Sequence, residues 1–310
     1  MVQTAIEKIS VIVVCGPTGS GKTALALSLA EKFPLEIISA DSRQVYRRMD
    51  IGTAKATIQE QAAIPHHMID LIDPDQEFSV AEFVDQARPL IREISARDKI
   101  PCIVGGTGLY IRALLGGLAQ LPSSDPELRE QLHQREHTEG PGYLFRELQQ
   151  IDPVAAAEIH PNNIIRIVRA LEVCALSGRK ISDLKAEHRF SQQPYHVIKL
   201  APDYPRTELY SRINLRSEQM IASGLVDEVR SLVTSYSLEL KSLQTLGYRE
   251  VVHYLKNDIT AEQMVGDIQK YTRQYAKRQL TWFRKETDII WVDSSMKSGR
   301  VVESIENYLL

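Results

Sequence analysis

Short hydrophobic runs alternate with amphipathic stretches along most of the chain. Runs rich in β-branched residues, bounded by polar or turn-forming residues, predict five strands, at residues 10–15, 36–40, 100–104, 196–200 and 288–292. Strands that alternate with helical segments are typical of a parallel sheet covered by helices. The pattern therefore predicts an α/β fold.

The segment 79–98 shows a clear helical pattern. Its apolar residues recur at helical spacing, at Val80, Phe83, Val84, Ala87, Ile91 and Ile94. Ser79 and Glu82 stand at the positions of a capping box, in which each side chain binds the backbone N–H of the other residue. Pro89 lacks an N–H, so we expect it to kink this helix or to lie on its solvent side.

The pattern changes between Leu121 and Pro194. Strand-like runs disappear, and the segment becomes polar and helical. We predict a helical insertion domain at residues 122–194 within a core formed by residues 1–121 and 195–310. A peripheral helical layer of the same domain is the alternative.

Composition and charge narrow the class of protein. The 310 residues are 43% hydrophobic and 25% charged, with a formal net charge of −3. This charge argues against indiscriminate coating of nucleic acid but allows a local basic face. The three cysteines are far apart, which argues against a zinc site or a disulfide framework. The N-terminus resembles no signal peptide and no apolar run is long enough to span a membrane, so we expect a soluble, cytoplasmic protein without membrane contact.

The first strand ends in a phosphate-binding motif. The sequence GPTGSGKT matches G-x-x-x-x-G-K-[ST], and a helical segment follows it. Backbone N–H groups of such a loop cradle anionic oxygens, Lys22 adds a mobile positive charge, and the Thr23 hydroxyl can hold Mg²⁺. The predicted donor-binding residues are Gly16, Pro17, Thr18, Gly19, Ser20, Gly21, Lys22 and Thr23. With its flanking strand and helix, the loop predicts a P-loop NTPase-like fold. Kinases, NTPases and group transferases all use such a loop, so it does not name a reaction.

Polar residues also follow the second and third predicted strands. Asp41 comes directly after the strand at 36–40, at the carboxyl end where open α/β sheets gather ligands. A carboxylate there can coordinate Mg²⁺ or accept a proton, and a turn or helix cap is the plain alternative. Thr107 follows the strand at 100–104 within a glycine-rich turn, which allows close approach of a substrate or forms only a tight turn.

Eight sequence blocks together resemble the tRNA dimethylallyltransferases, also called tRNA isopentenyltransferases. In chain order they are GPTGSGKT, IISADSRQVYRRMDIGTAK, PHHMID, VGGTGLYIRALL, PNNIIRIVRALEV, LYSRINLRSEQMIASGLVDEV, QTLGYREV and TRQYAKRQLTWFRK. The resemblance spans nearly the whole chain. It implies transfer of a dimethylallyl group from dimethylallyl pyrophosphate to the exocyclic N6 amine of the adenosine 3′ to the anticodon, with release of pyrophosphate.

The chemistry of that reaction suits these residues. The loop would hold a diphosphate that departs, and negative charge would grow on its bridging oxygen. Lys22, Mg²⁺ at Thr23 and Arg216, which the resemblance places near the reacting amine, would stabilise that charge. Asp41 is the candidate base for the amine. We therefore predict Asp41, Thr23, Arg216 and Lys22 as catalytic residues and Mg²⁺ as the cofactor.

Binding of the tRNA anticodon stem-loop requires a basic surface. The segment 270–285 carries six basic residues and no acid, and Lys270, Arg273, Lys277 and Arg284 fall within roughly 60° of one another on a helix. We expect Tyr271, Tyr275, Trp282 and Phe283 to lie on the other side of this helix and to pack on the core. The four basic residues form a stripe that we expect to bind RNA phosphates, and a solvated helix face without a ligand is the alternative. The resemblance implies tRNA contacts at Asp41, Ser42, Arg43, Gln44, Thr107, Arg129, Ile165, Arg166, Ile167, Val168, Arg169, Gln244, Thr245, Leu246, Gly247, Tyr248, Arg249, Lys277, Arg278, Gln279, Leu280, Thr281, Trp282, Phe283 and Arg284.

The chain departs from the family pattern at one of these positions. Ile165 stands where members commonly carry a polar or basic residue, which puts that contact in doubt. Eukaryotic members often add a C-terminal zinc finger, whose cysteines this sequence lacks, so we expect a bacterial-type form. The sequence leaves self-association open, and we take a monomer as the expectation. We interpret His66 and His67 as part of a loop beside the active site rather than as metal ligands.

Two other classes of protein compete with the transferase. One is a small-molecule enzyme on the same scaffold, either a P-loop kinase or an isopentenyltransferase that acts on free adenine nucleotides. The basic segment and the large insertion argue against it, because a free nucleotide requires neither. The other is a nucleotide-dependent switch, against which the lack of an obvious Walker B-type acid pair weighs modestly.

Overall fold

The computed structural model describes residues 8–119, 121–188, 193–293 and 298–309. The chain divides into two compact units, one formed by residues 1–115 and 193–310 and the other by residues 116–192. The second unit corresponds to the helical insertion that the sequence predicts at residues 122–194. The first seven residues, in which we expect no signal peptide, lie outside the described part of the chain.

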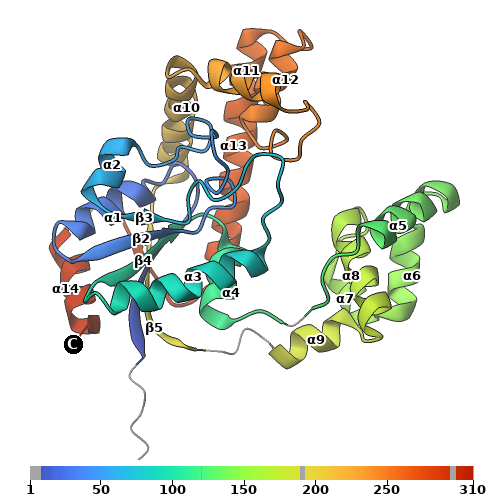
Figure 1. Ribbon diagram of the computed structural model, residues 1–310, viewed down its shortest axis with the longest axis horizontal. Coiled ribbons are helices and arrows are strands. Elements are labelled where there is room, and N and C mark those ends of the chain that lie inside the picture. The colour runs from blue at the N-terminus through green and yellow to red at the C-terminus, as the bar shows by residue number, and fades with distance from the viewer. Residues whose placement is uncertain (1–7, 120, 189–192, 294–297, 310) are drawn as a thin grey trace, which may run out of the picture. The chain divides into compact units, whose positions relative to one another are not determined.

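The larger unit is built on a parallel sheet of six strands (Figure 1). Their order across the sheet is β3-β2-β4-β1-β5-β6. The strands are β1 (Ile9–Cys15), β2 (Leu35–Ser39), β3 (His66–His67), β4 (Ile100–Gly105), β5 (Tyr195–Pro202) and β6 (Ile289–Val292). The predicted α/β class with a parallel sheet flanked by helices is confirmed, and five of the strands were predicted.

The edge strand β3 corrects one prediction. His66 and His67 were assigned to a loop beside the active site, but they pair with Ile37 and Ile38 of β2. The His67 Nε2 atom lies 2.8 Å from a carboxylate oxygen of Glu36. A two-residue strand is too short to produce an alternating pattern, so the sequence carried no signal for it.

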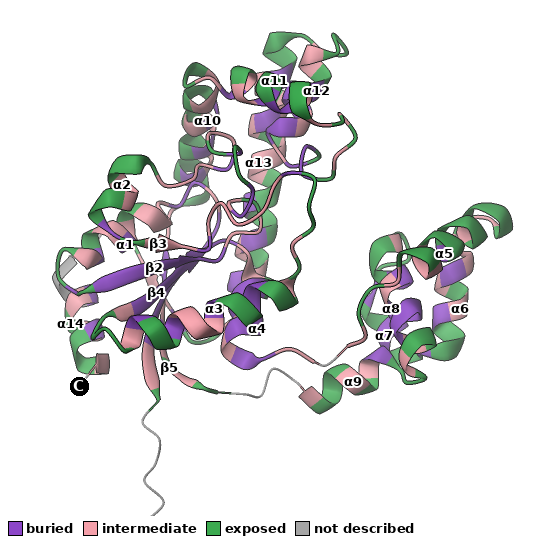
Figure 2. Cartoon of the chain, in the orientation of Figure 1, coloured by how far each residue is buried: buried purple, intermediate pink, exposed green. Residues whose placement is uncertain are grey.

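Helices cover both faces of the sheet. In the larger unit they are α1 (Lys22–Ala30), α2 (Ile58–Ala63), α3 (Val80–Ser95), α4 (Gly108–Gly116), α10 (Arg206–Ala222), α11 (Leu225–Ser235), α12 (Tyr248–Leu255), α13 (Ala261–Phe283) and α14 (Ser298–Leu309). The sheet is buried between them (Figure 2). The predicted capping box of α3 is present, because the Ser79 N–H donates to Glu82 and the Glu82 N–H donates to Ser79. Pro89 lies within α3 and is only half-buried.

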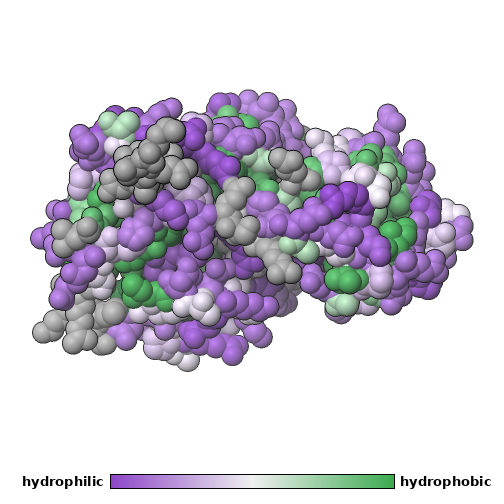
Figure 3. Space-filling model, turned by 90° about the horizontal axis from the view of Figure 1, so that it is seen from below, coloured by the Kyte–Doolittle hydropathy of each residue, from purple (hydrophilic) through white to green (hydrophobic). Residues whose placement is uncertain are grey.

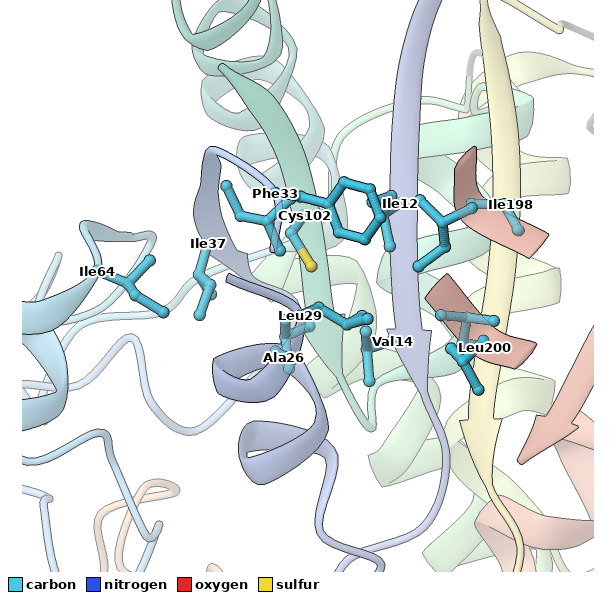
Figure 4. Close-up of a cluster of buried hydrophobic side chains, with 14 residues drawn as sticks. Ile12, Val14, Ala26, Leu29, Phe33, Ile37, Ile64, Cys102, Ile198 and Leu200 are labelled. Atoms are coloured by element: carbon cyan, nitrogen blue, oxygen red, sulfur yellow. The ribbon is translucent and has the colours of Figure 1, made fainter. Parts of the chain in front are cut away.

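The main core lies between the sheet and the helices α1 and α14. Figure 4 shows Ala26 and Leu29 of α1 against Val14 of β1, Cys102 of β4 and Leu200 of β5. Complete burial of one such aliphatic side chain stabilises the fold by about 1.5–3 kcal/mol. This core fixes the strands against one another and thereby fixes the loops that leave their carboxyl ends.

A second core holds the C-terminal helices together. It joins Leu225, Val229 and Leu232 of α11 to Val251 of α12 and Ile268 of α13. Val45 and Met49, from the segment after β2, are buried in the same cluster. That segment, which carries Asp41 at its start, is therefore anchored to α11 and α13.

The smaller unit is entirely helical in its described part. Its helices are α5 (Pro126–Glu139), α6 (Tyr143–Ile151), α7 (Pro153–Glu158), α8 (Ile164–Ser177) and α9 (Ile181–His188). Leu132, Leu144, Leu148, Ile167 and Leu171 form the centre of its own hydrophobic core. The predicted helical character of this segment is confirmed.

No helix within the described ranges is both long and apolar enough to traverse a bilayer. The face of the molecule in Figure 3 is mostly hydrophilic, with hydrophobic residues in small separate groups.

Candidate active site

Strand register brings three loops to one edge of the sheet. Cys15, the last residue of β1, pairs with Gly105, the last residue of β4. Ser39, the last residue of β2, pairs with Val104 in β4. The loops that begin at Gly16, Ala40 and Gly106 therefore start level with one another. This edge is where open parallel sheets bind ligands.

The loop after β1 has the geometry of an anion cradle. Gly19 and Gly21 both have φ of 79°, a left-handed conformation that side-chain-bearing residues rarely adopt. The Ser20 hydroxyl donates to the Pro17 carbonyl over 2.9 Å, which closes the loop on itself. Helix α1 begins at Lys22, so its N-terminal partial positive charge adds to that of the loop.

Lys22, at the start of α1, directs its side chain back to this loop. Its Nζ atom donates to the Pro17 carbonyl over 2.8 Å. Burial, followed by the charge of Arg216, lowers the pKa of Lys22 to about 8, and the charge of Asp41 opposes that shift. Burial also lowers the pKa of Arg216, again opposed by Asp41. Because these electrostatic effects weaken with distance, Lys22, Arg216 and Asp41 belong to one site.

Backbone and side-chain contacts fix Asp41 between two loops. Its Oδ1 atom accepts a hydrogen bond of 2.8 Å from the Arg43 N–H. The next residue, Ser42, donates its N–H to the Thr107 hydroxyl over 3.1 Å, and the Thr107 N–H donates to the Ala40 carbonyl over 3.2 Å. The structure therefore brings Asp41 and Thr107, both predicted from strand ends, to the same place.

The close approach of β2 and β4 depends on a glycine. A Cβ atom built on Gly105 would lie 2.1 Å from the Ala40 carbonyl oxygen, a backbone atom that cannot turn away. We expect Gly105→Ala to lower the free energy of unfolding by about 1–3 kcal/mol, as overpacking typically does. We also expect it to lower activity, because it would part Thr107 from Ala40 and Ser42, which flank Asp41. Thermal and urea unfolding measure the change. Gly266→Ala is the matched control, since a Cβ there meets nothing within 4 Å. Equal stability of Gly105→Ala and the wild type would contradict the close contact.

Arg212, another arginine of α10, contacts the phosphate loop, and sequence reasoning missed it. The Arg212 Nε–H donates to the Gly19 carbonyl over 3.1 Å, and its guanidinium lies 4.5 Å from the centre of the Tyr204 ring. Arg212 stands four residues before Arg216, so both lie on one face of α10. That spacing was a signal available in the sequence.

The Gln44 side chain forms hydrogen bonds that tie the loop after β2 together. Its Oε1 atom accepts from the Ser39 hydroxyl over 2.8 Å, and its Nε2 atom donates to the carbonyls of Thr53 and Ala54. Arg43, in contrast, is exposed. The tRNA contacts predicted for Ser42, Arg43 and Gln44 stay predictions.

The predicted RNA residues around α12 are partly buried. Tyr248 is fully buried, and its hydroxyl donates to Glu228 over 2.6 Å. Arg249 is paired with the buried Glu250 and lies over the Tyr271 ring. Gln244 is exposed, whereas Thr245 and Gly247 are buried and Leu246 is half-buried. Among these residues, Gln244 is exposed, and Leu246 and Arg249 are half-buried.

Helix α13 has an exposed face that carries basic residues and an opposite face that is buried. Gln274, Lys277, Arg278 and Thr281 line a hollow of about 420 Å³ on the exposed face. Two members of the predicted stripe are engaged elsewhere: Arg273 donates to the Asn214 side chain, and Arg284 pairs with Asp203. Lys270 lies 3.8 Å from Asp267.

The aromatic residues of α13 follow the prediction only in part. Phe283 is buried, Trp282 and Tyr271 are half-buried, and Leu280 packs against the small cluster formed by α10 and α13. Tyr275 was predicted to pack on the core, but 37% of it is exposed, so that prediction is wrong. Burial of its hydroxyl, followed by the charge of Asp41, raises the pKa of Tyr275 to about 12. Tyr275 therefore lies near the site and was missed as a candidate residue.

In the helical unit, two predicted RNA-binding arginines share one buried carboxylate. Glu172 is fully buried and accepts hydrogen bonds from Arg129 and Arg169. Burial would raise the pKa of Glu172, but these hydrogen bonds outweigh it and hold the pKa below its usual value. Arg166 is exposed, and so is the atypical Ile165, of which 76% is accessible. Ile167 and Val168 are buried in the core of this unit.

The donor set at the loop fits Mg²⁺ held mainly by a substrate. Thr23 lies in the first turn of α1, next to Lys22, and is half-buried. Within the described ranges, no three His, Cys, Asp or Glu side chains form a metal-binding group. Mg²⁺ commonly takes one or two protein ligands and completes its shell with phosphate oxygens and water. A threonine hydroxyl beside a phosphate loop suits that mode.

Two family models match the sequence. The model described as IPP transferase matches residues 44–286, and the model described as isopentenyl transferase matches residues 9–70. The chain is 48% identical to tRNA dimethylallyltransferase 1 of Syntrophotalea carbinolica, with 96% of each chain covered. It is 50% identical to the protein of the same name from Citrifermentans bemidjiense, with 93% of each covered.

The chain is also similar to solved structures of tRNA-modifying transferases. The tRNA isopentenylpyrophosphate transferase of Bacillus halodurans is similar with a TM-score of 0.71 at 39% identity, over 98% of this chain and 96% of that one. A eukaryotic dimethylallyltransferase acting on tRNA is similar with a TM-score of 0.84 at 29% identity, over 97% of this chain and 79% of that one. With the model match covering most of the sequence, and relatives this similar over nearly their full length, the chain belongs to the IPP transferase family.

Proposed function

We propose that this protein transfers a dimethylallyl group from dimethylallyl pyrophosphate to the N6 amine of the adenosine 3′ to the anticodon of tRNA. The observation that carries the proposal is the meeting of three loops at one sheet edge, with Lys22, Arg216 and Asp41 in one electrostatic environment. The names of the similar proteins, which describe tRNA dimethylallyl and isopentenylpyrophosphate transfer, support it.

The loop after β1 binds the diphosphate of the donor. Backbone N–H groups of the loop, the start of α1 and the Lys22 ammonium supply the positive charge that anionic oxygens require. As the allylic C–O bond breaks, negative charge develops on the departing oxygen, and Lys22 and Arg216 stabilise it. Mg²⁺ bound through Thr23 would add positive charge to the same diphosphate.

Asp41 acts on the acceptor. The exocyclic amine of adenine is a poor nucleophile because its lone pair is delocalised into the ring. As the N6 nitrogen forms its bond to the allylic carbon, an N–H proton passes to the Asp41 carboxylate, and pyrophosphate leaves with the electrons of the broken C–O bond. A positioned base of this kind contributes typically 10²–10⁴-fold to the rate.

RNA delivers the adenosine from outside the site. An adenosine in an anticodon loop must be unstacked and extruded to reach a protein pocket. Lys277 and Arg278, which are exposed on α13, and Arg129 and Arg169, which are half-buried in the helical unit, supply phosphate contacts. We place the reaction in the cytoplasm. We also propose that the protein acts as a monomer, since the larger unit alone carries all three loops of the site.

One assay tests the proposal. The protein is incubated with dimethylallyl pyrophosphate, Mg²⁺ and either an anticodon hairpin with adenosine at the target position or free AMP, and pyrophosphate release is measured. Release that requires the hairpin supports the proposal. Release with AMP would identify a free-nucleotide transferase, and ATP turnover without a prenyl donor would identify a kinase or a switch.

The basic face of α13 gives a separate prediction. Lys277 is exposed and lines the hollow on that face. Lys277→Ala should weaken hairpin binding and reduce the slope of log K against log salt by roughly one phosphate contact. Binding is measured by titration at several salt concentrations. Lys256→Ala, which removes an exposed lysine after α12, is the control and should leave the slope unchanged. An unchanged slope in Lys277→Ala would remove this face from the RNA interface.

A further inference from the structure

One buried amide on α13 joins two of the loops that form the site. The Gln279 Oε1 atom accepts a hydrogen bond of 2.8 Å from the Thr18 N–H in the phosphate loop. Its Nε2 atom donates to the Gly106 carbonyl over 2.9 Å. Only 7% of Gln279 is exposed. Its side chain thus bridges the donor loop after β1 and the loop after β4, here called the acceptor loop because its Thr107 holds the segment that carries Asp41.

The space around this bridge is filled. A Cβ atom built on Gly106 would lie 2.3 Å from the Gln279 Nε2 atom and 3.4 Å from the Gly16 carbonyl oxygen. A neighbouring residue of the same helix, Trp282, packs on the start of α4, because a Cβ built on Gly108 would lie 2.2 Å from its Nε1 atom. The bridge therefore sets the spacing of the two loops at one value.

The helix that carries this bridge also carries the exposed basic face. Gln279 is buried together with Ala276, three residues before it, and Phe283, four residues after it, so the three lie on the inner side of α13. Lys277, Arg278 and Thr281 lie on the exposed side and line the hollow. A single helix thus faces the RNA surface on one side and the diphosphate loop on the other.

We propose that Gln279 is a positioning residue that aligns the donor loop with the acceptor loop and couples RNA binding on α13 to diphosphate binding. The proposal rests on the proposed function. It differs from a direct RNA contact, because both ends of the Gln279 amide are already occupied by protein backbone. Displacement of reacting groups by about 1 Å can cost 10²-fold in rate, which sets the scale of the expected effect.

The bridge also defines which backbone groups bind the donor. The Thr18 N–H donates to Gln279 and the Ser20 N–H donates to the Pro17 carbonyl over 3.4 Å, so the diphosphate is left to the remaining N–H groups of the loop and to Lys22. Any movement of α13 on RNA binding acts directly on the peptide that contains this N–H. Coupling between two ligands is reciprocal and typically amounts to 5–150-fold in affinity.

The test measures both ligands on one protein without turnover. The probes are inorganic pyrophosphate and an anticodon hairpin with purine, which lacks the exocyclic amine, at the target position. Hairpin Kd is measured with and without saturating pyrophosphate, and kcat is measured separately with dimethylallyl pyrophosphate and the adenosine hairpin. In the wild type we expect pyrophosphate to change the hairpin Kd at least about 5-fold.

Gln279→Leu keeps the side-chain size and removes both hydrogen bonds. We expect kcat to fall by about 10²-fold, the hairpin Kd without pyrophosphate to stay within about 2-fold, and the effect of pyrophosphate on that Kd to disappear. Gln279→Glu keeps an acceptor for the Thr18 N–H but places a carboxylate oxygen against the Gly106 carbonyl, and it should lose the coupling as well. Gln269→Leu is the control, since it removes hydrogen bonds from α13 to Asn214 and Glu218 on α10 and reaches neither loop.

A variant that leaves Gln279 intact provides an independent check. Gly106→Ala displaces the Gln279 amide by the close contact described above, so it should reproduce the loss of coupling. The double variant with Gln279→Leu should lose little more than either single variant, because both act on one contact.

The outcomes separate this inference from the proposed function. Preserved coupling and kcat in a folded Gln279→Leu or Gln279→Glu would overturn the inference while wild-type transfer to the hairpin still stood. A Gln279→Leu protein that loses hairpin affinity alone would identify Gln279 as an RNA contact instead. Absence of any hairpin-dependent transfer by the wild type would count against the proposed function itself.

Discussion

Replacement of Asp41 by asparagine is expected to lower kcat by at least about 10²-fold and to leave hairpin binding nearly intact. Asparagine has the same shape, and its side-chain oxygen can still accept the hydrogen bond from the Arg43 N–H. What it lacks is the negative charge and the ability to take a proton from the adenine amine. Single-turnover rates and hairpin Kd values, measured on the same preparation, show which of the two properties changes.

Asp41→Asn requires a control for the general effect of removing a carboxylate. Asp73→Asn removes a surface carboxylate that pairs with Arg47 at 3.4 Å, and such exposed pairs contribute roughly 0–1 kcal/mol to stability. It should leave both kcat and hairpin binding unchanged. Wild-type turnover in Asp41→Asn would remove Asp41 from the mechanism, and lost binding with unchanged turnover of bound RNA would make it an RNA contact only.

The sequence predicted the parts of this site that depend on local pattern. Five strands could be read because buried parallel strands are continuous apolar runs, and their carboxyl ends placed Asp41 and Thr107 correctly beside the phosphate loop. Strand β3 could not be read, since its two residues are held by pairing with β2 and not by their own pattern.

Contacts between distant segments were beyond the reach of sequence reasoning. Gln279 was assigned to an RNA-binding run, and its pairing with Thr18, 261 positions earlier, depends on how α13 packs across the sheet edge. Tyr275 fits a helical pattern for burial, yet its ring is partly exposed because α13 presents that face to solvent near Asp41. Side-chain type and spacing predicted which helix forms, and tertiary packing decided what each side chain touches.

The pattern of burial also explains why a run of predicted RNA residues is not a run of contacts. Along a helix, neighbouring residues point about 100° apart, so a continuous segment such as 277–284 divides between both faces. Lys277 and Thr281 face solvent, whereas Gln279 and Phe283 face the protein interior. In the same way, Ile167 and Val168 are buried in the core of the helical unit, whereas Arg166 is exposed and Arg169 is half-buried beside Glu172.

Replacement of Lys22 by methionine should lower kcat/KM by about 10²–10³-fold, the usual cost of removing one donor to a developing oxyanion. Methionine keeps most of the length and the apolar stem but has no charge. The wild type should also show a basic limb in its pH profile. The pKa of Lys22 is lowered to about 8, so in the free protein the ammonium that binds diphosphate is present below pH 8 and is lost as the pH rises through that value. Since kcat/KM reports groups of the free enzyme, it should fall above about pH 8.

Lys22→Arg separates this titration from others on the protein or the RNA. A guanidinium stays charged throughout this range, so the variant, whatever its absolute activity, should lose the limb near pH 8. Lys32→Met removes an exposed lysine after α1 and should keep both the activity and the limb. A basic limb of unchanged position in Lys22→Arg would assign the titration to another group. Full activity of Lys22→Met would show that the loop holds its diphosphate without the lysine, and the charge that stabilises the departing oxygen would then have to come from Arg216 and the metal ion.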